Sequence, residues 1–96
     1  MKIPEKVKIG PHWFDVDIVE VVDVTMGLRG KIDTLSNSIR LMRDQAQSKQ
    51  EETLFHEVLH EIAASLGIHD AILDEESITR LAYGFYQFLV DNDLLK

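Results

Sequence analysis

Apolar and charged residues alternate along the first half of the chain in the manner of β-strands. The clearest run is residues 14–21, FDVDIVEV, and a period of two places successive side chains on opposite faces of a sheet. Shorter strands are predicted at residues 7–9, 29–33 and 38–42, with a turn at residues 34–37. We expect these strands to form a small N-terminal antiparallel β-sheet.

Beyond Asp44 the apolar residues recur at intervals of three and four, which is the spacing of a helix. Residues 45–66 contain neither Gly nor Pro, and Gly67 is expected to end this first helix. Its apolar stripe consists of Phe55, Val58, Leu59, Ile62 and Leu66. A second helix is predicted from the capping residue Asp74 to residues 91–92. Its stripe consists of Ile78, Leu81, Ala82, Phe85, Phe88 and Leu89. Strands followed by two helices indicate an α+β fold.

Length and composition suit one small globular domain, which we expect to span residues 1–96. The formal net charge is -7, and no cluster of Lys and Arg is present, so nucleic acid is not an expected partner. No signal-peptide-like or membrane-spanning apolar run occurs, so we expect no membrane association and a cytoplasmic location. The chain has no cysteine, so any metal must be held by His and carboxylate side chains.

The predicted first helix contains the motif HExxH, as His56-Glu57-Val58-Leu59-His60. Side chains four residues apart lie one turn apart on the same helix face, so both imidazoles can bind one Zn²⁺ at roughly 2.0 to 2.1 Å. Glu57 lies about 100° round the helix from His56, too far to join as a third ligand. Instead, it can take a proton from a zinc-bound water as that water attacks a carbonyl. His56 and His60 are therefore the predicted metal ligands, and Glu57 is the predicted catalytic base.

A catalytic zinc site needs three protein ligands and one open position, so a third ligand must come from another element. Glu75 and Glu76 both lie in the first turn of the second helix. On a helical wheel Glu75 lies about 75° from the centre of the apolar stripe, whereas Glu76 lies nearly opposite. Glu75 is therefore the predicted third ligand. Glu76 and Asp74 stay as alternatives. Any of the three carboxylates can instead stabilise the second helix by interacting with the positive end of its dipole.

His69 is a further alternative ligand, nine residues after His60. The three-histidine motif HExxHxxGxxH would need Gly at position 63 and His at position 66. The chain has Ala63 and Leu66 there. His69 is therefore expected either to lie in a loop or to donate a hydrogen bond to one of the metal ligands.

Other polar side chains are weaker candidates for a role in catalysis. Tyr83 and Arg80 lie on the second helix and are candidates for an electrophile that stabilises an oxyanion. His12 is expected at the surface, and Glu61 is expected to point toward solvent.

The chain resembles small HExxH proteins, mostly of phage and prophage origin, that look like stripped-down gluzincins related to the repressor-cleaving ImmA/IrrE-like peptidases. The similar segments, in about the C-terminal two thirds, are residues 30–33 (GKID), 39–41 (IRL), 50–60 (QEETLFHEVLH), Glu75, 81–84 (LAYG) and 91–92 (DN). The resemblance implies a minimal zincin-like fold, two histidine ligands, a catalytic Glu and a carboxylate ligand on the following helix. The Glu-Ala-Asn run of the repressor-cleaving enzymes is missing after Glu75, so we do not expect repressor cleavage.

The resemblance also implies that an edge strand beside the metal receives the substrate as an added strand. Residues 38–42, immediately before the metal-binding helix, are the expected edge strand. We therefore expect a zinc-dependent metallopeptidase that acts on a peptide or protein substrate. Two alternatives are a non-catalytic module stabilised by zinc and a metal-free interaction protein that works through its acidic surface.

Overall fold

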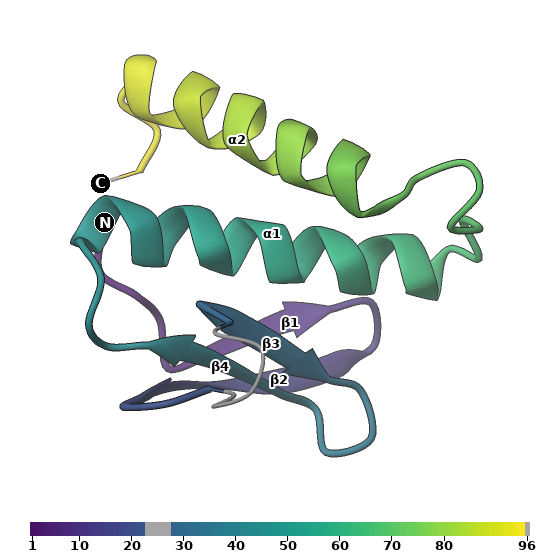
Figure 1. The fold of residues 1–96 in the computed structure, drawn as a ribbon, viewed down its shortest axis with the longest axis horizontal. Coiled ribbons are helices and arrows are strands. Elements are labelled where there is room, and N and C mark those ends of the chain that lie inside the picture. The colour runs from purple at the N-terminus through teal and green to yellow at the C-terminus, as the bar shows by residue number, and fades with distance from the viewer. Residues whose placement is uncertain (23–27, 96) are drawn as a thin grey trace.

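The computed structural model describes residues 1–22 and 28–95, which contain four strands followed by two helices (Figure 1). The strands are β1 (Lys6–Ile9), β2 (His12–Val19), β3 (Gly30–Asp33) and β4 (Ser38–Met42). The helices are α1 (Gln47–Ser65) and α2 (Glu75–Asp91). This arrangement confirms the predicted α+β class, and the predicted elements lie close to their expected positions.

The sheet is mixed, which corrects the expectation of an antiparallel sheet. Its strand order is β1-β2-β4-β3. The outer pairs β1–β2 and β3–β4 are antiparallel, but the central strands β2 and β4 run parallel. Alternating apolar residues identify a strand and its buried face, and they carry no information on the direction of the neighbouring strand. The β3–β4 hairpin places β4 against β2 and leaves β3 at the edge of the sheet.

Two tight turns join the antiparallel pairs. Gly10, between β1 and β2, has a φ of 56°, which glycine adopts without steric cost. In the β3–β4 turn, the Asp33 carboxylate accepts a hydrogen bond from the backbone N–H of Leu35 at 2.9 Å. Asn37 closes this turn with a φ of 52°, a conformation that Asn tolerates well. The predicted turn at residues 34–37 is therefore confirmed.

Helix α1 lies between the sheet and α2, so the molecule has three layers (Figure 1). The main core is formed where α1 covers one face of the sheet. It consists of Ile9, Phe14, Val16, Ile39, Leu41 and Leu54. Within the described part of the chain, α2 packs on α1 and not on the sheet. Neither helix of these residues is long and apolar enough to cross a membrane.

The buried face of α1 differs from the predicted apolar stripe. Its buried residues are Glu51, Leu54, Glu57, Glu61 and Ala63, whereas Leu66 is 71% exposed. A helix that contacts a sheet on one side and a second helix on another has two buried faces, so a single stripe describes it poorly. Glu61, expected to point toward solvent, is only 8% exposed, and that expectation was wrong.

Helix α2 begins as predicted, at the capping residue Asp74. The Asp74 carboxylate accepts a hydrogen bond from the backbone N–H of Ser77 at 2.8 Å, and this interaction lowers the pKa of Asp74. Ile78 and Ala82 are the buried residues that face α1. Further along, Tyr86 donates a hydrogen bond from its hydroxyl to the buried carboxylate of Glu51 at 2.9 Å.

Gly30 lets the edge strand β3 approach α1 closely. A Cβ atom at this position would overlap the methyl group of Thr53 on α1, and it would lie 3.3 Å from the Arg40 carbonyl oxygen on β4. The neighbouring strand backbone cannot yield as a flexible side chain would. A larger residue at position 30 must therefore displace the Thr53 side chain or push β3 away from α1.

We expect Gly30→Ala to lower the free energy of unfolding by about 1–3 kcal/mol, because it overpacks the contact between β3 and α1. Gly84→Ala is the matched control, since a Cβ atom at Gly84 in α2 would meet nothing within 4 Å. Alanine should stabilise that exposed helical position by about 0.5–1 kcal/mol. Urea unfolding of both variants gives the comparison. A Gly30→Ala protein as stable as the parent would show that β3 does not depend on this close approach.

Candidate metal and active site

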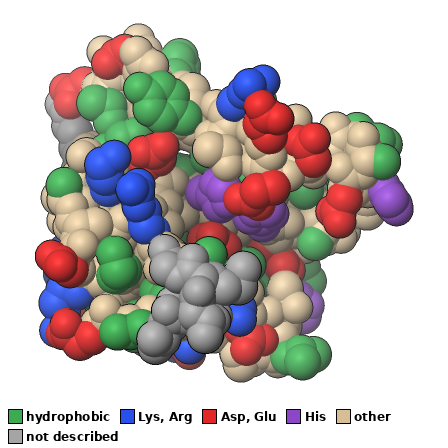
Figure 2. All heavy atoms as spheres, viewed as in Figure 1, with side chains coloured by type: hydrophobic (Ala, Val, Ile, Leu, Met, Phe, Trp, Pro, Cys, Tyr) green, Lys and Arg blue, Asp and Glu red, His purple; other side chains and the backbone are tan. Residues whose placement is uncertain are grey.

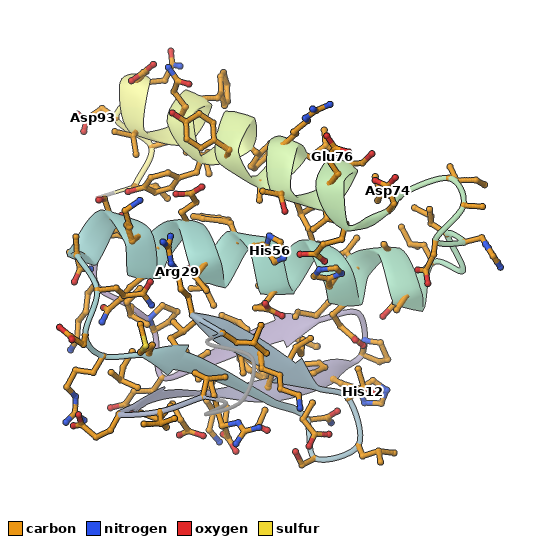
Figure 3. All side chains as sticks on the ribbon, viewed as in Figure 1. His12, Arg29, His56, Asp74, Glu76 and Asp93 are labelled. Atoms are coloured by element: carbon orange, nitrogen blue, oxygen red, sulfur yellow. The ribbon has the colours of Figure 1, made fainter. Side chains whose placement is uncertain are left out.

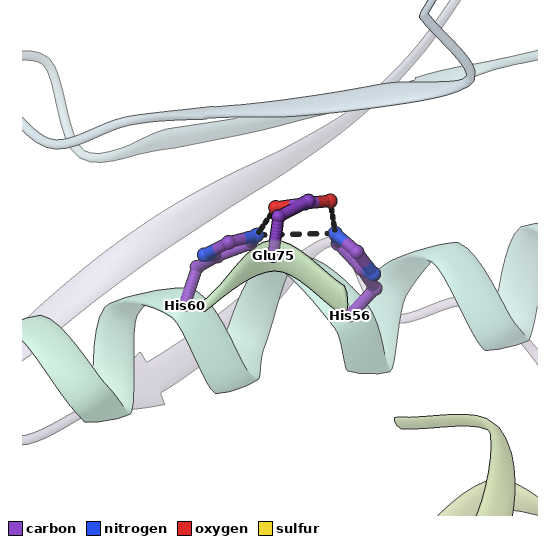
Figure 4. Close-up of side chains that lie close together, drawn as sticks. All are labelled: His56, His60 and Glu75. Atoms are coloured by element: carbon purple, nitrogen blue, oxygen red, sulfur yellow. Dashed lines mark hydrogen bonds and ion pairs between the residues drawn. The ribbon is translucent and has the colours of Figure 1, made fainter. Parts of the chain in front are cut away.

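Helix α1 presents His56 and His60 side by side, one turn apart. Their Nε2 atoms lie 3.1 Å apart, and the two rings meet edge to face. Both side chains are partly buried, His56 more deeply than His60. The two imidazoles therefore direct the same nitrogen toward one point above α1 (Figure 4).

Glu75, the first residue of α2, completes this group from the second helix. One carboxylate oxygen lies 2.9 Å from Nε2 of His56, and the other lies 2.7 Å from Nε2 of His60. Two local features fix its position: the Asp74 cap starts the helix immediately before it, and Ile78, one turn later, is buried against α1. The structure thus brings the three predicted ligands together, as Figure 4 shows.

The three side chains fit a metal ion by their chemistry and their spacing. Among the described residues, His56, His60 and Glu75 form the one group of three metal-binding side chains whose ligand atoms all lie within 4.8 Å of one another. Tetrahedral zinc with bonds near 2.0 Å would separate neighbouring ligand atoms by about 3.3 Å. The two histidine Nε2 atoms are 3.1 Å apart, close to this value, and the Glu75 oxygens at 2.9 and 2.7 Å from them need only a small outward shift of this exposed carboxylate.

Glu57 lies beside the three ligands, on the side of α1 nearer the sheet. It is 8% exposed, and this burial raises the pKa of its carboxyl. His56 and His60 lower that pKa, the nearby Glu75 raises it, and the backbone N–H of Ile32 lowers it by hydrogen bonding. A cation bound by the neighbouring ligands would also lower it. The charges of all three proposed ligands therefore influence the pKa of Glu57.

The alternative third ligands have other partners. Asp74 caps α2 through Ser77, and Glu76 forms an ion pair with Arg80 at 2.6 Å. His69 accepts a hydrogen bond through Nδ1 from the backbone N–H of Ala71 at 3.1 Å, which places it in the connection between the helices as expected. Figure 3 shows Asp74 and Glu76 at the start of α2, away from His56.

The other candidate residues are not part of this group. Arg80 pairs with Glu76. Tyr83 is exposed and lines a different hollow, with Ser48 and Gln87. His12 is the first residue of β2, away from His56 (Figure 3). The structure therefore gives no support to Tyr83 or Arg80 as oxyanion-stabilising groups.

Two hollows meet at the three ligands, and His56, Glu57 and Glu75 line both. One has a volume of about 290 Å³ and extends toward Arg29 and Lys49. The other has a volume of about 630 Å³ and extends past His60 toward residues 61–73. Histidine and acidic side chains gather in the middle of this face of the molecule (Figure 2). Together the hollows form a cleft with the candidate metal site near its centre.

The edge strand beside this cleft is β3, and the expectation that it would be residues 38–42 was wrong. That segment, β4, lies inside the sheet between β2 and β3. Gly30 of β3 lines both hollows. The Met42 N–H on β4 donates to the Arg29 carbonyl oxygen at 2.8 Å. In an antiparallel pair, hydrogen-bonded and non-hydrogen-bonded residues alternate along each strand. The N–H and C=O groups of Gly30 and Ile32 therefore point away from β4.

Sequence reasoning missed two features of the site. Glu61 lines the larger hollow, but its place on the helix wheel suggested a solvated residue. Gly30 was placed only within the predicted strand at residues 29–33, and its close packing on Thr53 depends on how α1 crosses the sheet. Neither feature follows from spacing along one element.

Comparisons of the chain with protein-family models, with curated proteins and with solved structures return no match.

Proposed function

We propose that the chain is a zinc-dependent metallopeptidase. The observation that carries this proposal is the meeting of three metal-binding side chains with a buried carboxylate and a strand edge. His56 and His60 on α1 and Glu75 on α2 are the ligands, Glu57 is the general base, and β3 binds the substrate. The resemblance to small HExxH gluzincin-like proteins supports the same function.

The proposed ligand set suits a catalytic zinc ion. Two imidazoles and one carboxylate leave one coordination position open, which is typical of catalytic and not of structural zinc sites. A zinc ion bound there acidifies a water molecule and polarises a carbonyl group. Glu75 comes from the exposed start of a helix, so its carboxylate has room to adjust to the metal.

Glu57 has the properties that a general base requires. It follows His56 directly on α1, so its carboxylate lies next to the proposed ligands, and in the metal-free protein its burial raises the pKa of its carboxyl, which favours proton acceptance. In peptide hydrolysis it would take a proton from the attacking water and deliver it to the amide nitrogen that leaves. Its burial between α1 and the sheet keeps this carboxylate beside the ligands.

The substrate in this proposal is an extended peptide lying along β3. The backbone groups of Gly30, which β3 turns away from β4, can pair with such a peptide, as in other cases of strand addition. The cleft continues on both sides of the metal ligands, so residues on either side of the scissile bond would have space. An extended segment of a protein satisfies this geometry better than a compact small molecule.

A non-catalytic zinc-stabilised module is the second candidate. One observation favours it: the three ligands join α1 to α2, and α2 packs on α1 alone among the described elements. Metal affinity would then add to folding stability. This alternative gives Glu57 no role, so a Glu57 variant separates the two functions.

We expect the purified protein to bind one equivalent of Zn²⁺, with Glu75→Ala lowering the zinc affinity by at least about a hundredfold. Glu76→Ala is the matched control and should bind zinc like the parent, because Glu76 pairs with Arg80. Isothermal titration with a competing chelator measures both. At free zinc 100-fold above Kd, the parent should gain about 2.7 kcal/mol of stability.

Two results of this titration would contradict the proposed ligand set. If Glu75→Ala and Glu76→Ala lost the same zinc affinity, the loss would be due to the negative charge at the start of α2 and not to a metal ligand. Loss in His69→Ala with normal binding by Glu75→Ala would replace the proposed ligand set by three histidines.

We expect Glu57→Gln to keep its zinc and to lose at least about 100-fold of any peptidase activity, because the amide cannot accept the proton. Activity is measured on a library of internally quenched peptides, with zinc content determined on the same samples. Glu76→Gln is the isosteric control and should keep full activity. A Glu57→Gln protein without zinc would make Glu57 a ligand and contradict the mechanism.

A further inference from the structure

Glu61 is a buried carboxylate that lacks one of its hydrogen-bond partners. It follows His60 on α1 and is 8% exposed. Ser65, one turn later, donates a hydrogen bond to Oε1 at 3.2 Å. No described residue donates to Oε2. A buried carboxylate oxygen without a donor is costly, so its presence beside a cleft needs an explanation.

The surroundings of Glu61 are those of a side-chain pocket. Glu61 lines the larger hollow, of about 630 Å³, a volume in the usual range of ligand sites. Apolar side chains form much of its wall, namely Ile32, Ile68, Leu73 and Ile78. Asp70 adds a second carboxylate away from the metal ligands, and Lys31 is the one cationic residue among those that line the hollow.

We propose that this hollow is a subsite for a lysine or arginine side chain of the substrate. The inference rests on the proposed peptidase function and adds a specificity to it. The methylene groups of such a side chain would lie along the apolar wall. Its charged end would donate the hydrogen bond that Oε2 of Glu61 lacks, once the Glu61 side chain turns this covered oxygen toward the hollow. A hydrogen bond between charged partners in a partly buried site is stronger than one between neutral groups.

The opposite half of the cleft has a different charge. Apart from His56, Glu57 and Glu75, which line both hollows, the charged residues of the smaller hollow are Arg29, Lys49 and Glu52. Figure 3 shows Arg29 near His56, on the side of the cleft away from the connection between the helices. A positively charged substrate side chain is therefore favoured on the Glu61 side and disfavoured on the Arg29 side. This polarity would set the direction in which a peptide lies across the metal.

Two zinc-binding probes test the subsite without requiring turnover. Nα-acetyl-lysine hydroxamate and Nα-acetyl-norleucine hydroxamate share the same metal-binding group and nearly the same side-chain length, but only lysine carries the charge. We expect the zinc-loaded parent to bind the lysine probe at least about tenfold more tightly. Glu61→Gln should lose this preference and bind the norleucine probe as the parent does. Isothermal titration measures the four affinities.

A second measurement guards against a Glu61→Gln protein that fails to fold. In the parent, the lysine probe should shift the carboxyl ¹³C resonance of Glu61 and the amide resonance of Ser65, and the norleucine probe should leave the carboxyl resonance nearly unchanged. Equal affinity of the two probes for the parent would overturn the subsite while leaving the metal site intact. A lysine preference that survives in Glu61→Gln would also overturn it. Failure of both probes to bind a protein that takes up no zinc would contradict the peptidase proposal and, with it, the subsite.

Discussion

Helix α1 buries three glutamates, and the organisation of the cleft follows from how each buried carboxylate is compensated. Removing a carboxylate from water is costly unless hydrogen bonds or opposite charges replace its hydration. Glu51 accepts hydrogen bonds from Tyr86 and Gln47, which joins α1 to α2. Glu57 lies near His56, His60 and the Ile32 N–H, all of which lower the pKa of its carboxyl. Glu61 has Ser65 on one oxygen only. Glu51 therefore has a structural role. We propose that Glu57 acts in catalysis and that Glu61 binds the substrate.

The three-layer arrangement explains why these carboxylates are buried at all. Because α1 lies between the sheet and α2, its Glu57 side faces β3 while its histidine side faces the start of α2. Gly30 allows β3 to come close to α1, and the Asp74 cap fixes where α2 begins. The proposed base, ligands and substrate-binding strand thus come from three elements whose packing is set by a glycine, a cap and an apolar core.

The sequence was a good guide to features that repeat along one element and a poor guide to contacts between elements. Period-two and helical patterns placed every described strand and helix, and the wheel of α2 correctly separated Glu75 from Glu76. The parallel pairing of β2 with β4 was missed because alternation does not encode strand direction. Glu61 was misplaced because a single apolar stripe cannot describe a helix with two buried faces. The wrong choice of edge strand followed from the missed sheet order.

The most direct test of the account is X-ray absorption spectroscopy of the zinc-loaded protein at the zinc K edge. We expect four nitrogen or oxygen ligands at about 2.0 to 2.1 Å from the zinc ion. The outer-shell scattering should be that of two imidazole rings, from His56 and His60. The remaining ligands would be the Glu75 carboxylate and a water molecule. Scattering from three imidazoles, or a shell of six oxygen atoms like that of the hydrated ion, would contradict the proposed metal site.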